Sequence, residues 1–226
     1  ETIVSESAAS NLTINSGLLA VAGAGDRVAT TTLTLGGSEG FVYTDRGADL
    51  EVLGVLAGAS SSLGKGGPGT LILSGAGANT FAGATRVEAG TLRAQKNTAF
   101  GVANANGNVV YYGATVELAG VDIPAETLTL YGYGEGLRAM IPLRSASGTN
   151  TWQGNVVLGN DRTGIRVEDS SELIINGVIS NEGFNKFGEG ILEFGGTADN
   201  TFVRTSIVWD GTLELNKTAG KNAISS

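Results

Sequence analysis

The chain has 226 residues, with 14 basic against 22 acidic side chains and a formal net charge of −8, a balance that disfavours nucleic acid and anionic membrane surfaces as partners. It contains neither cysteine nor histidine, which excludes disulfides, thiolate nucleophiles, Cys/His zinc sites and imidazole acid–base chemistry. No apolar run approaches the roughly 18 residues that a membrane-spanning helix needs, and the 36 glycines lack the every-third-residue spacing of collagen.

Short stretches of alternating apolar residues follow one another along the chain. Each predicts a β-strand with one face turned inward, because side chains alternate with a period of two in strands. The alternating pairs, in chain order, are Leu12 and Ile14, Leu33 and Leu35, Phe41 and Tyr43, Leu50 and Val52, Leu71 and Leu73, Val116 and Leu118, Leu128 and Leu130, Val156 and Leu158, Ile165 and Val167, Leu173 and Ile175, Leu192 and Phe194, and Leu213 and Leu215. Turn residues separate them, as at 15–17, 23–26 and 104–108. The stretch closest to a helix, 94–105, contains a glycine and an asparagine and is predicted to be a loop or a single turn.

One segment of the sequence occurs twice in similar form. A shift of 121 residues places 65–92 on 186–213 with 12 identities in 28 positions, whereas glycine-rich composition alone predicts roughly two or three. Residues 50–55 match 173–178 at a shift of 123, so the change of length falls in a connecting segment, as expected in a repeat array. We therefore predict repeat copies at about 50–101 and 173–224, with a less repetitive stretch at 102–163.

Short strands, frequent turns and a repeated unit predict an all-β fold, with a sandwich or barrel as the alternative to the favoured solenoid. The favoured architecture is a right-handed, single-stranded parallel β-helix forming one domain over 1–226, in which coils of about 20 to 25 residues stack into roughly ten turns. Glycines are expected where φ is positive or where coils approach closely. Asn79 and Asn200 are predicted to occupy corners, because asparagine tolerates left-handed backbone and its amide can bond local backbone.

The segment "KGGPGTLILSGAGANTFAGATRVEAGTLRAQKNTAFG" at 65–101 resembles the autotransporter-associated β-strand repeat, also called the passenger-associated transport repeat. The segment beginning "KFGEGILEFGG" at Lys186 resembles a more degenerate copy, in which Ile191 replaces a threonine and Arg204 stands where the pattern prefers glycine. The resemblance implies a right-handed parallel β-helix in the exported part of a bacterial surface protein, extracellular or on the outer cell surface. In that family the repeat supplies a stalk on which functional regions are displayed.

Charged side chains gather in one segment at 161–172. Carboxylates there could bind Ca²⁺ or act as acid and base, and arginines accompany them. Alternation with Ile165 and Val167 makes a solvated strand face the simpler interpretation, so no catalytic, metal or cofactor site is predicted. The charged residues are Asp161, Arg162, Arg166, Glu168, Asp169 and Glu172.

Aromatic side chains gather between the repeat copies. The patterns "VVYYG" and "LYGYG" place some rings outward, where exposed rings stack on sugars, although rings that pack over coil edges are the simpler alternative. These residues are Tyr111, Tyr112, Tyr131, Tyr133 and Trp152.

Neither terminal stretch resembles an amphipathic capping helix, so we expect either a segment of a longer solenoid or ends that stack on copies of the chain. The predicted function is a non-catalytic, adhesin-like structural passenger or stalk of an exported bacterial surface protein. Its expected partners are copies of itself, adjacent solenoid segments or surface glycans, and no cofactor is expected. The alternatives are a self-assembling extracellular filament subunit and a β-helical polysaccharide-active enzyme.

Overall fold

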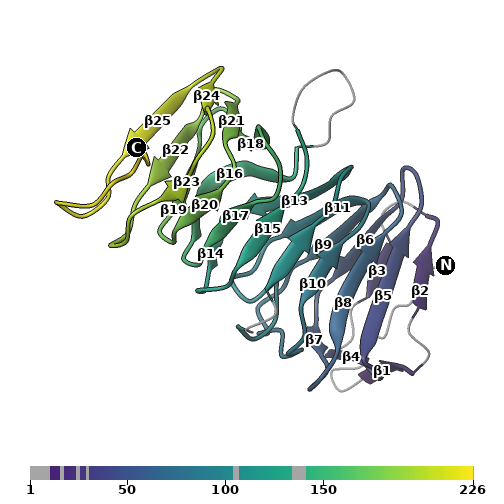
Figure 1. Ribbon diagram of the computed structural model, residues 1–226. Coiled ribbons are helices and arrows are strands. Elements are labelled where there is room, and N and C mark those ends of the chain that lie inside the picture. The colour runs from purple at the N-terminus through teal and green to yellow at the C-terminus, as the bar shows by residue number, and fades with distance from the viewer. Residues whose placement is uncertain are drawn as a thin grey trace.

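The computed structural model describes residues 11–15, 18–23, 26–28, 31–103, 107–133 and 141–225. The N-terminal segment 1–10, for which no capping helix is predicted, lies outside these residues, as do parts of the predicted turns at 15–17, 23–26 and 104–108. The described residues form 25 strands and no helix, so they contain no helix that is long and apolar enough to cross a membrane. Figure 1 shows these strands stacked along one axis, from the purple N-terminal end to the yellow C-terminal end.

The strands form three sheets, and every strand pair is parallel. The first sheet contains β1 (Asn11–Ile14), β4 (Thr32–Leu35) and β7 (Val55–Ala57). The second contains, in spatial order, β2 (Leu18–Val21), β5 (Glu39–Thr44), β8 (Ser62–Gly66), β10 (Thr85–Val87), β12 (Asn108–Val110), β15 (Leu128–Leu130), β17 (Val156–Leu158), β20 (Ile179–Asn181) and β23 (Thr201–Phe202).

The third sheet follows the order β24 (Ile207–Val208), β21 (Phe184–Phe187), β18 (Thr163–Val167), β16 (Leu143–Trp152), β13 (Ala114–Ala119), β11 (Gly90–Ala94), β9 (Thr70–Leu73), β6 (Asp49–Val52) and β3 (Asp26–Val28). The long strand β16 also begins a branch of this sheet. The strands of the branch are β14 (Asp122–Ile123), β19 (Ser171–Ile175), β22 (Ile191–Phe194) and β25 (Thr212–Leu215).

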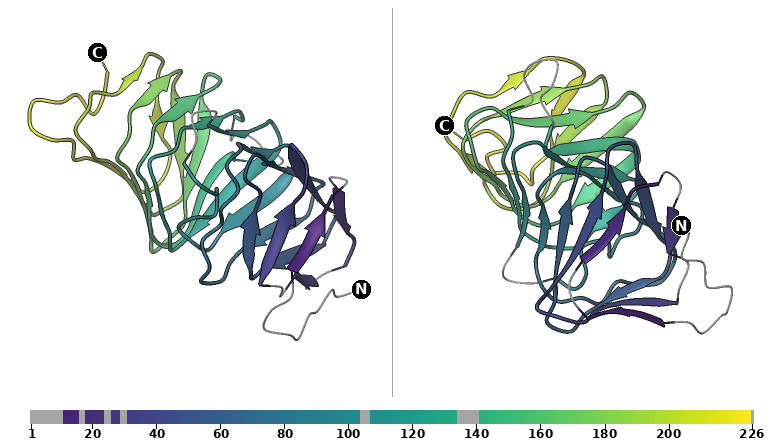
Figure 2. Two further views of the ribbon diagram at one scale, coloured as in Figure 1. Left: turned by 90° about the horizontal axis from the view of Figure 1, so that it is seen from below. Right: turned by 90° about the vertical axis from the view of Figure 1, so that its right-hand side faces the viewer.

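Each coil of the solenoid adds one strand to the second sheet. Arg86 pairs with Val109 and Val156 pairs with Ile179, so a coil advances the chain by 23 residues at these places, within the predicted 20 to 25. The nine strands of this sheet correspond to about eight turns, slightly fewer than the roughly ten expected. The predicted parallel β-helix is thus confirmed, and the two views of Figure 2 show its coils succeeding one another along the chain.

The inward faces of the strands form one apolar core along the axis. Leu71 and Leu73 of β9 are fully buried, as their alternation predicts. The prediction for β5 has the right period but the wrong face, because Val42 is buried while Tyr43 is 39% exposed. Phe41 lies outside, over Gly64: a Cβ built there would be 2.4 Å from the Phe41 ring. Alternation of apolar residues on both faces of a strand therefore does not identify the inward face.

Glycine occupies turns where adjacent coils meet without space for a side chain. Gly75 has a φ of +80°, and a Cβ built on it would lie 1.9 Å from the carbonyl oxygen of Leu53 in the preceding coil. The equivalent Gly196 has a φ of +86° and would meet Asn176 O at 1.8 Å. Both parts of the prediction for glycine, positive φ and close approach of coils, apply at these positions.

Asn79 and Asn200 connect coils and do not close local turns. Neither has a positive φ, so the left-handed conformation expected for them is not what selects asparagine there. Asn79 Oδ1 accepts from the backbone N–H of Leu56 at 2.9 Å, and its Nδ2 donates to the carbonyl of Ala99 at 3.3 Å. Asn200 bonds in the same way to Ile179 N and Ala223 O. Each asparagine thus joins the coil before it to the coil after it.

Two lysines are completely buried at equivalent positions of the repeat copies. Lys65 Nζ donates to the carbonyls of Gly66, Gly67 and Ala89 at 2.8 to 3.0 Å. Lys186 Nζ donates to the carbonyls of Gly188 and Asp210 at 2.6 and 2.9 Å. Each ammonium therefore satisfies carbonyls of a turn in its own coil and in the next. Desolvation lowers the pKa of Lys65 to about 8 and shifts the pKa of Lys186 in the same direction.

Candidate functional site

A row of tyrosines lies on the surface of the less repetitive stretch. Tyr111 directly follows β12 and Tyr131 directly follows β15, and these two strands pair in register. Tyr131 N donates to Val110 O at 2.9 Å, which holds the two residues at the same place in successive coils. Tyr112 and Tyr133 lie beside them, so the four side chains form one group that is called the tyrosine row below.

The rings of the tyrosine row contact one another in sequence. The centroids of Tyr111 and Tyr131 are 6.3 Å apart with ring planes inclined by 13°. Tyr112 lies 5.9 Å from Tyr131 and 5.7 Å from Tyr133, in tilted arrangements. Tyr111, Tyr112 and Tyr133 are 40, 53 and 52% exposed. The prediction that some of these rings point outward is correct.

The corner that carries Tyr111 and Tyr131 has no general requirement for an aromatic residue. In the register of the second sheet, Gly66 and Glu88 precede Tyr111 at this corner, and Gly159 follows Tyr131. A Cβ on Gly159 would lie 2.5 Å from the ring of Tyr131, so that ring covers the backbone of the next coil. The line of corners also carries Tyr43, which pairs with Gly66, but the coils directly before Tyr111 and directly after Tyr131 have Glu88 and Gly159 there.

Polar groups border the tyrosine row. Asn160 Oδ1 accepts from the backbone N–H of Gly132, between Tyr131 and Tyr133 in the sequence, at 2.8 Å. Asp161 follows Asn160 and is exposed, and Glu88 is exposed in the coil that precedes Tyr111. The surface thus combines ring faces with hydrogen-bond acceptors.

Trp152 does not belong to this surface. Its side chain is completely buried, its ring centroid lies 5.2 Å from that of Phe100, and its Nε1 donates to the carbonyl of Glu126 at 2.9 Å. Trp152 is thus one of the aromatic residues for which the alternative of a packed ring applies. Trp152 is the last residue of the long strand β16, at a position that points inward. Its place in the sequence, near the tyrosines, does not show which way it points.

The charged segment at 161–172 is divided between different parts of the solenoid. Glu168 accepts from Arg144 Nε at 2.7 Å and from Arg166 Nε at 2.8 Å. Partial burial acts to raise the pKa of Glu168, but the hydrogen bonds from the two arginines outweigh it and hold that pKa below its usual value. Glu172 lies on β19, in the branch of the third sheet, where its Oε2 accepts from Thr149 Oγ1 at 3.3 Å.

The arginines beside Glu168 belong to a ladder of ion pairs across the third sheet. The side chain of Glu117 is 3% exposed and lies between Arg93, which donates to its Oε1, and Arg144, which donates to its Oε2 at 2.7 Å. Asp161 and Asp169 are exposed and stand apart from this ladder. Across the described ranges, no group of three or more aspartate or glutamate side chains is arranged to hold a metal ion.

A buried carboxyl just before β15 is absent from the sequence-based prediction. Glu126 is 2% exposed and precedes β15, the strand that leads to Tyr131. Desolvation raises its pKa to about 7, although a hydrogen bond from Asn108 acts in the opposite direction. Its neighbours in the sequence, Pro124 and Thr127, give no sign of burial, so only the packing of the coils reveals it.

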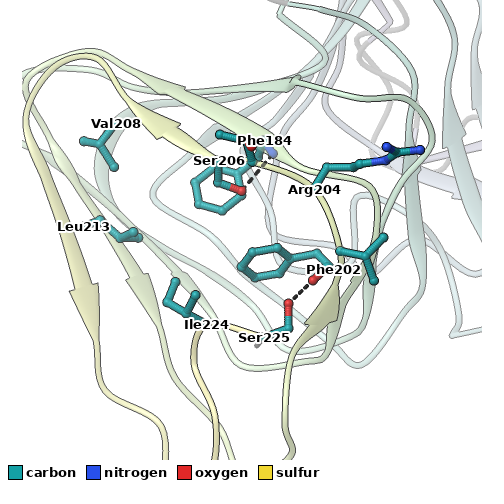
Figure 3. Close-up of a pocket in the computed structure, with 10 residues that line it drawn as sticks. Phe184, Phe202, Arg204, Ser206, Val208, Leu213, Ile224 and Ser225 are labelled. Atoms are coloured by element: carbon teal, nitrogen blue, oxygen red, sulfur yellow. Dashed lines mark hydrogen bonds between the residues drawn. The ribbon is translucent and has the colours of Figure 1, made fainter.

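An apolar groove of about 340 Å³ opens at the last described coil (Figure 3). Figure 3 shows the side chains of Phe184, Phe202, Leu213 and Ile224 directed toward this space. The backbone N–H of Phe184 donates to Ser206 Oγ at 3.2 Å on one wall of the groove. Among the described residues that line the groove, most are apolar and Arg204 is the only charged one.

Comparison with known proteins gives one family match and one curated relative. The passenger-associated-transport-repeat family matches residues 63–94 and 184–215, two segments 121 residues apart within the predicted repeat copies. The chain is 30% identical over 224 residues to the adhesin BmaC autotransporter of Brucella suis biovar 1 (strain 1330), which covers 98% of this chain. The chain spans about 6% of the length of that relative. No solved structure matches the chain.

Proposed function

We propose that this chain, which carries two passenger-associated transport repeats and is similar to an autotransporter adhesin, is a non-catalytic structural segment of an adhesin-like surface protein. Its place would be the exported passenger, outside the cell or on its outer surface. There the stacked coils act as a stalk that holds binding surfaces away from the membrane.

The shared environment of Lys65 and Lys186 carries this proposal. The two lysines occupy the same position in the matched segments, are fully buried and donate to turn carbonyls of two successive coils. These two lysines are therefore used to join coils, and their buried ammonium groups are inaccessible to a ligand. A repeat with this use is a building unit of a stalk.

The ion pairs of the charged segment support the non-catalytic part of the proposal. Glu168 is held between Arg144 and Arg166, with a pKa below its usual value, so it is poorly suited to donate a proton. Glu172 lies in a different branch of the sheet. This arrangement disfavours the polysaccharide-active alternative.

Surface display tests the proposed function. The chain is placed between an export signal and the translocator of an autotransporter, and protease accessibility on intact cells is measured. We expect the wild-type chain to be displayed in a folded form, and the double variant Lys65→Met/Lys186→Met to be displayed less and degraded more. The control Lys221→Met changes an exposed lysine and is expected to behave as the wild type. Equal display of the double variant, or release of reducing ends from an acidic polysaccharide, contradicts the proposal.

A filament subunit is the second candidate, and the groove at the last described coil, where the lining residues Val208 and Ile224 are 41% and 44% exposed, is the observation that favours it. A second copy that stacks on this coil would cover those side chains. Sedimentation over a range of concentrations tests this candidate, with Ile224→Asp as the variant because Ile224 is exposed in the groove. Growth of the wild type into end-to-end assemblies that the variant does not form supports it, and a concentration-independent monomer contradicts it.

A further inference from the structure

We propose that the tyrosine row is a docking surface for a neutral glycan, whose sugar rings stack on the exposed faces of Tyr112 and Tyr133. The inference rests on the proposed function, because it gives the passenger segment a class of partner. It starts from an exposed aromatic area that the fold does not require: Tyr43, Gly66 and Glu88 precede Tyr111 on the same line of corners, so a coil closes there with or without an aromatic residue.

The rings are presented as a rigid surface. Tyr111 and Tyr131 are fixed by the register of β12 and β15, and the ring of Tyr131 covers Gly159. Tyr112 leans against both Tyr131 and Tyr133, with ring centroids 5.9 and 5.7 Å apart. Mutual contact restricts the side chains before any ligand binds, so little conformational entropy remains to be lost on binding.

The chemistry of the surface selects for sugars. The apolar C–H face of a sugar ring packs on an aromatic face, while its hydroxyls need hydrogen-bond partners at the edge. The phenol hydroxyls supply such partners, and exposed carboxylates lie in the adjoining coils: Glu88 holds the register position before Tyr111, and Asp161 follows Asn160, which bonds Gly132. A purely apolar partner would leave these carboxylates without water or hydrogen bonds, at a cost in free energy.

The charge of the surface selects for neutral sugars. Glu88 and Asp161 are both exposed carboxylates, and the whole chain carries a formal charge of −8. A uronic-acid polysaccharide would be repelled by this field, whereas a neutral oligosaccharide would not. The row extends over two successive coils, so it suits several units of an extended chain better than one monosaccharide.

Titration calorimetry of the purified chain with neutral hexasaccharides tests the proposal. Cellohexaose, laminarihexaose and chitohexaose serve as probes, with oligogalacturonate as the acidic comparison. At least one neutral probe is expected to bind, and Tyr112→Ala and Tyr133→Ala are each expected to weaken it by about tenfold. Tyr112→Phe keeps the ring and is expected to retain most of the affinity.

Tyr43→Ala is the matched control. Tyr43 is an exposed tyrosine that pairs with Gly66 on the same line of corners, but no described ring contacts it. Failure of every neutral probe to bind at millimolar concentration, equal weakening by Tyr43→Ala, or binding of oligogalacturonate alone would each overturn the proposal. Binding to cells gives a further check. If the wild-type chain still binds cells whose surface glycans have been removed enzymatically and the tyrosine variants do not, the partner is a protein and the proposal is also wrong. Each of these failures leaves the surface-display assay unaffected, so it is distinguishable from failure of the proposed function.

Discussion

Asn108 Nδ2 donates a 2.8 Å hydrogen bond to Oε2 of Glu126, while Oε1 of the same buried carboxyl has no hydrogen-bond partner within the described residues. The carboxyl is thus only half satisfied. Ionisation would leave a charge in the interior with a single neutral donor, which is why the pKa of Glu126 is raised to about 7.

This shift makes stability depend on pH. The folded-state pKa of Glu126 lies above the ordinary value of 4.5, so its stabilising contribution is complete below about pH 4.5 and is lost as the pH rises through about 7. Glu126→Gln keeps an acceptor for Asn108 and cannot ionise. We expect the variant to match the wild type near pH 4 and to exceed it above pH 8 by on the order of 3 kcal/mol in free energy of unfolding. Urea denaturation of both proteins across this range measures the difference, and a difference that does not change with pH contradicts the assignment.

Loss of the Lys65 ammonium should destabilise the first repeat copy. Lys65→Met leaves the carbonyls of Gly66, Gly67 and Ala89 without this donor in a buried turn. We expect a loss of about 2 kcal/mol or more in free energy of unfolding, measured by urea denaturation. Lys221→Met serves as the control because Lys221 is exposed and its ion pair with Asp199 is long at 3.8 Å, so its change should stay within about 0.5 kcal/mol. Equal losses of free energy of unfolding in the two variants would contradict the stabilising role of the buried Lys65.

The connection between coils through Asn79 can be tested by truncation. Asn79→Ala leaves the backbone N–H of Leu56 unpaired inside the solenoid and removes an acceptor from Lys96. A loss of about 2 to 3 kcal/mol is expected from thermal or urea unfolding. Asn97→Ala removes an acceptor that bonds the exposed N–H of Asp122, where water can replace it, and should cost less than about 1 kcal/mol. A cost for Asn97→Ala as large as that for Asn79→Ala would show that burial is not the deciding factor.

Two glycines separate backbone strain from steric contact. Gly47 and Gly75 have φ values of +75° and +80°, but nothing lies within 4 Å of a Cβ on Gly47, whereas Leu53 O lies 1.9 Å from a Cβ on Gly75. Gly47→Ala should therefore cost about 1 to 2 kcal/mol from the left-handed conformation alone. Gly75→Ala should cost clearly more, because the coils must move apart. Equal melting temperatures for the two variants would contradict this reading of the coil contact.

The fold could be predicted from the sequence because its rules are periodic. The alternation of Leu71 and Leu73 predicts a strand, and the recurrence of one segment after 121 residues predicts a repeat fold such as a solenoid. Alternation did not decide the face of β5, because the outward Phe41 and Tyr43 are large aromatic residues that alternate with the single inward valine, Val42. The space above Gly64 made the outward position available to Phe41, and such a space exists only after coils have stacked.

The site could be predicted only in part. The dense tyrosines near Tyr112 are visible in the sequence, and exposure follows from their place after short strands. Contacts between residues more than 20 positions apart are not visible in the same way. The burial of Glu126, the inward turn of Trp152 and the use of Lys65 inside the solenoid all depend on which coil lies next to which.

The position of Lys96 has a mechanical consequence. Its Nζ donates to Gly54 O at 2.9 Å, Gly77 O at 3.0 Å and Asn79 Oδ1 at 3.0 Å, so one side chain holds three successive coils. Lys217 joins Gly177 and Gly195 in the second repeat copy in the same manner. A force that separates these coils along the axis must therefore also break the hydrogen bonds of Lys96 or Lys217. Each repeat copy thus carries one lysine that resists the separation of its coils.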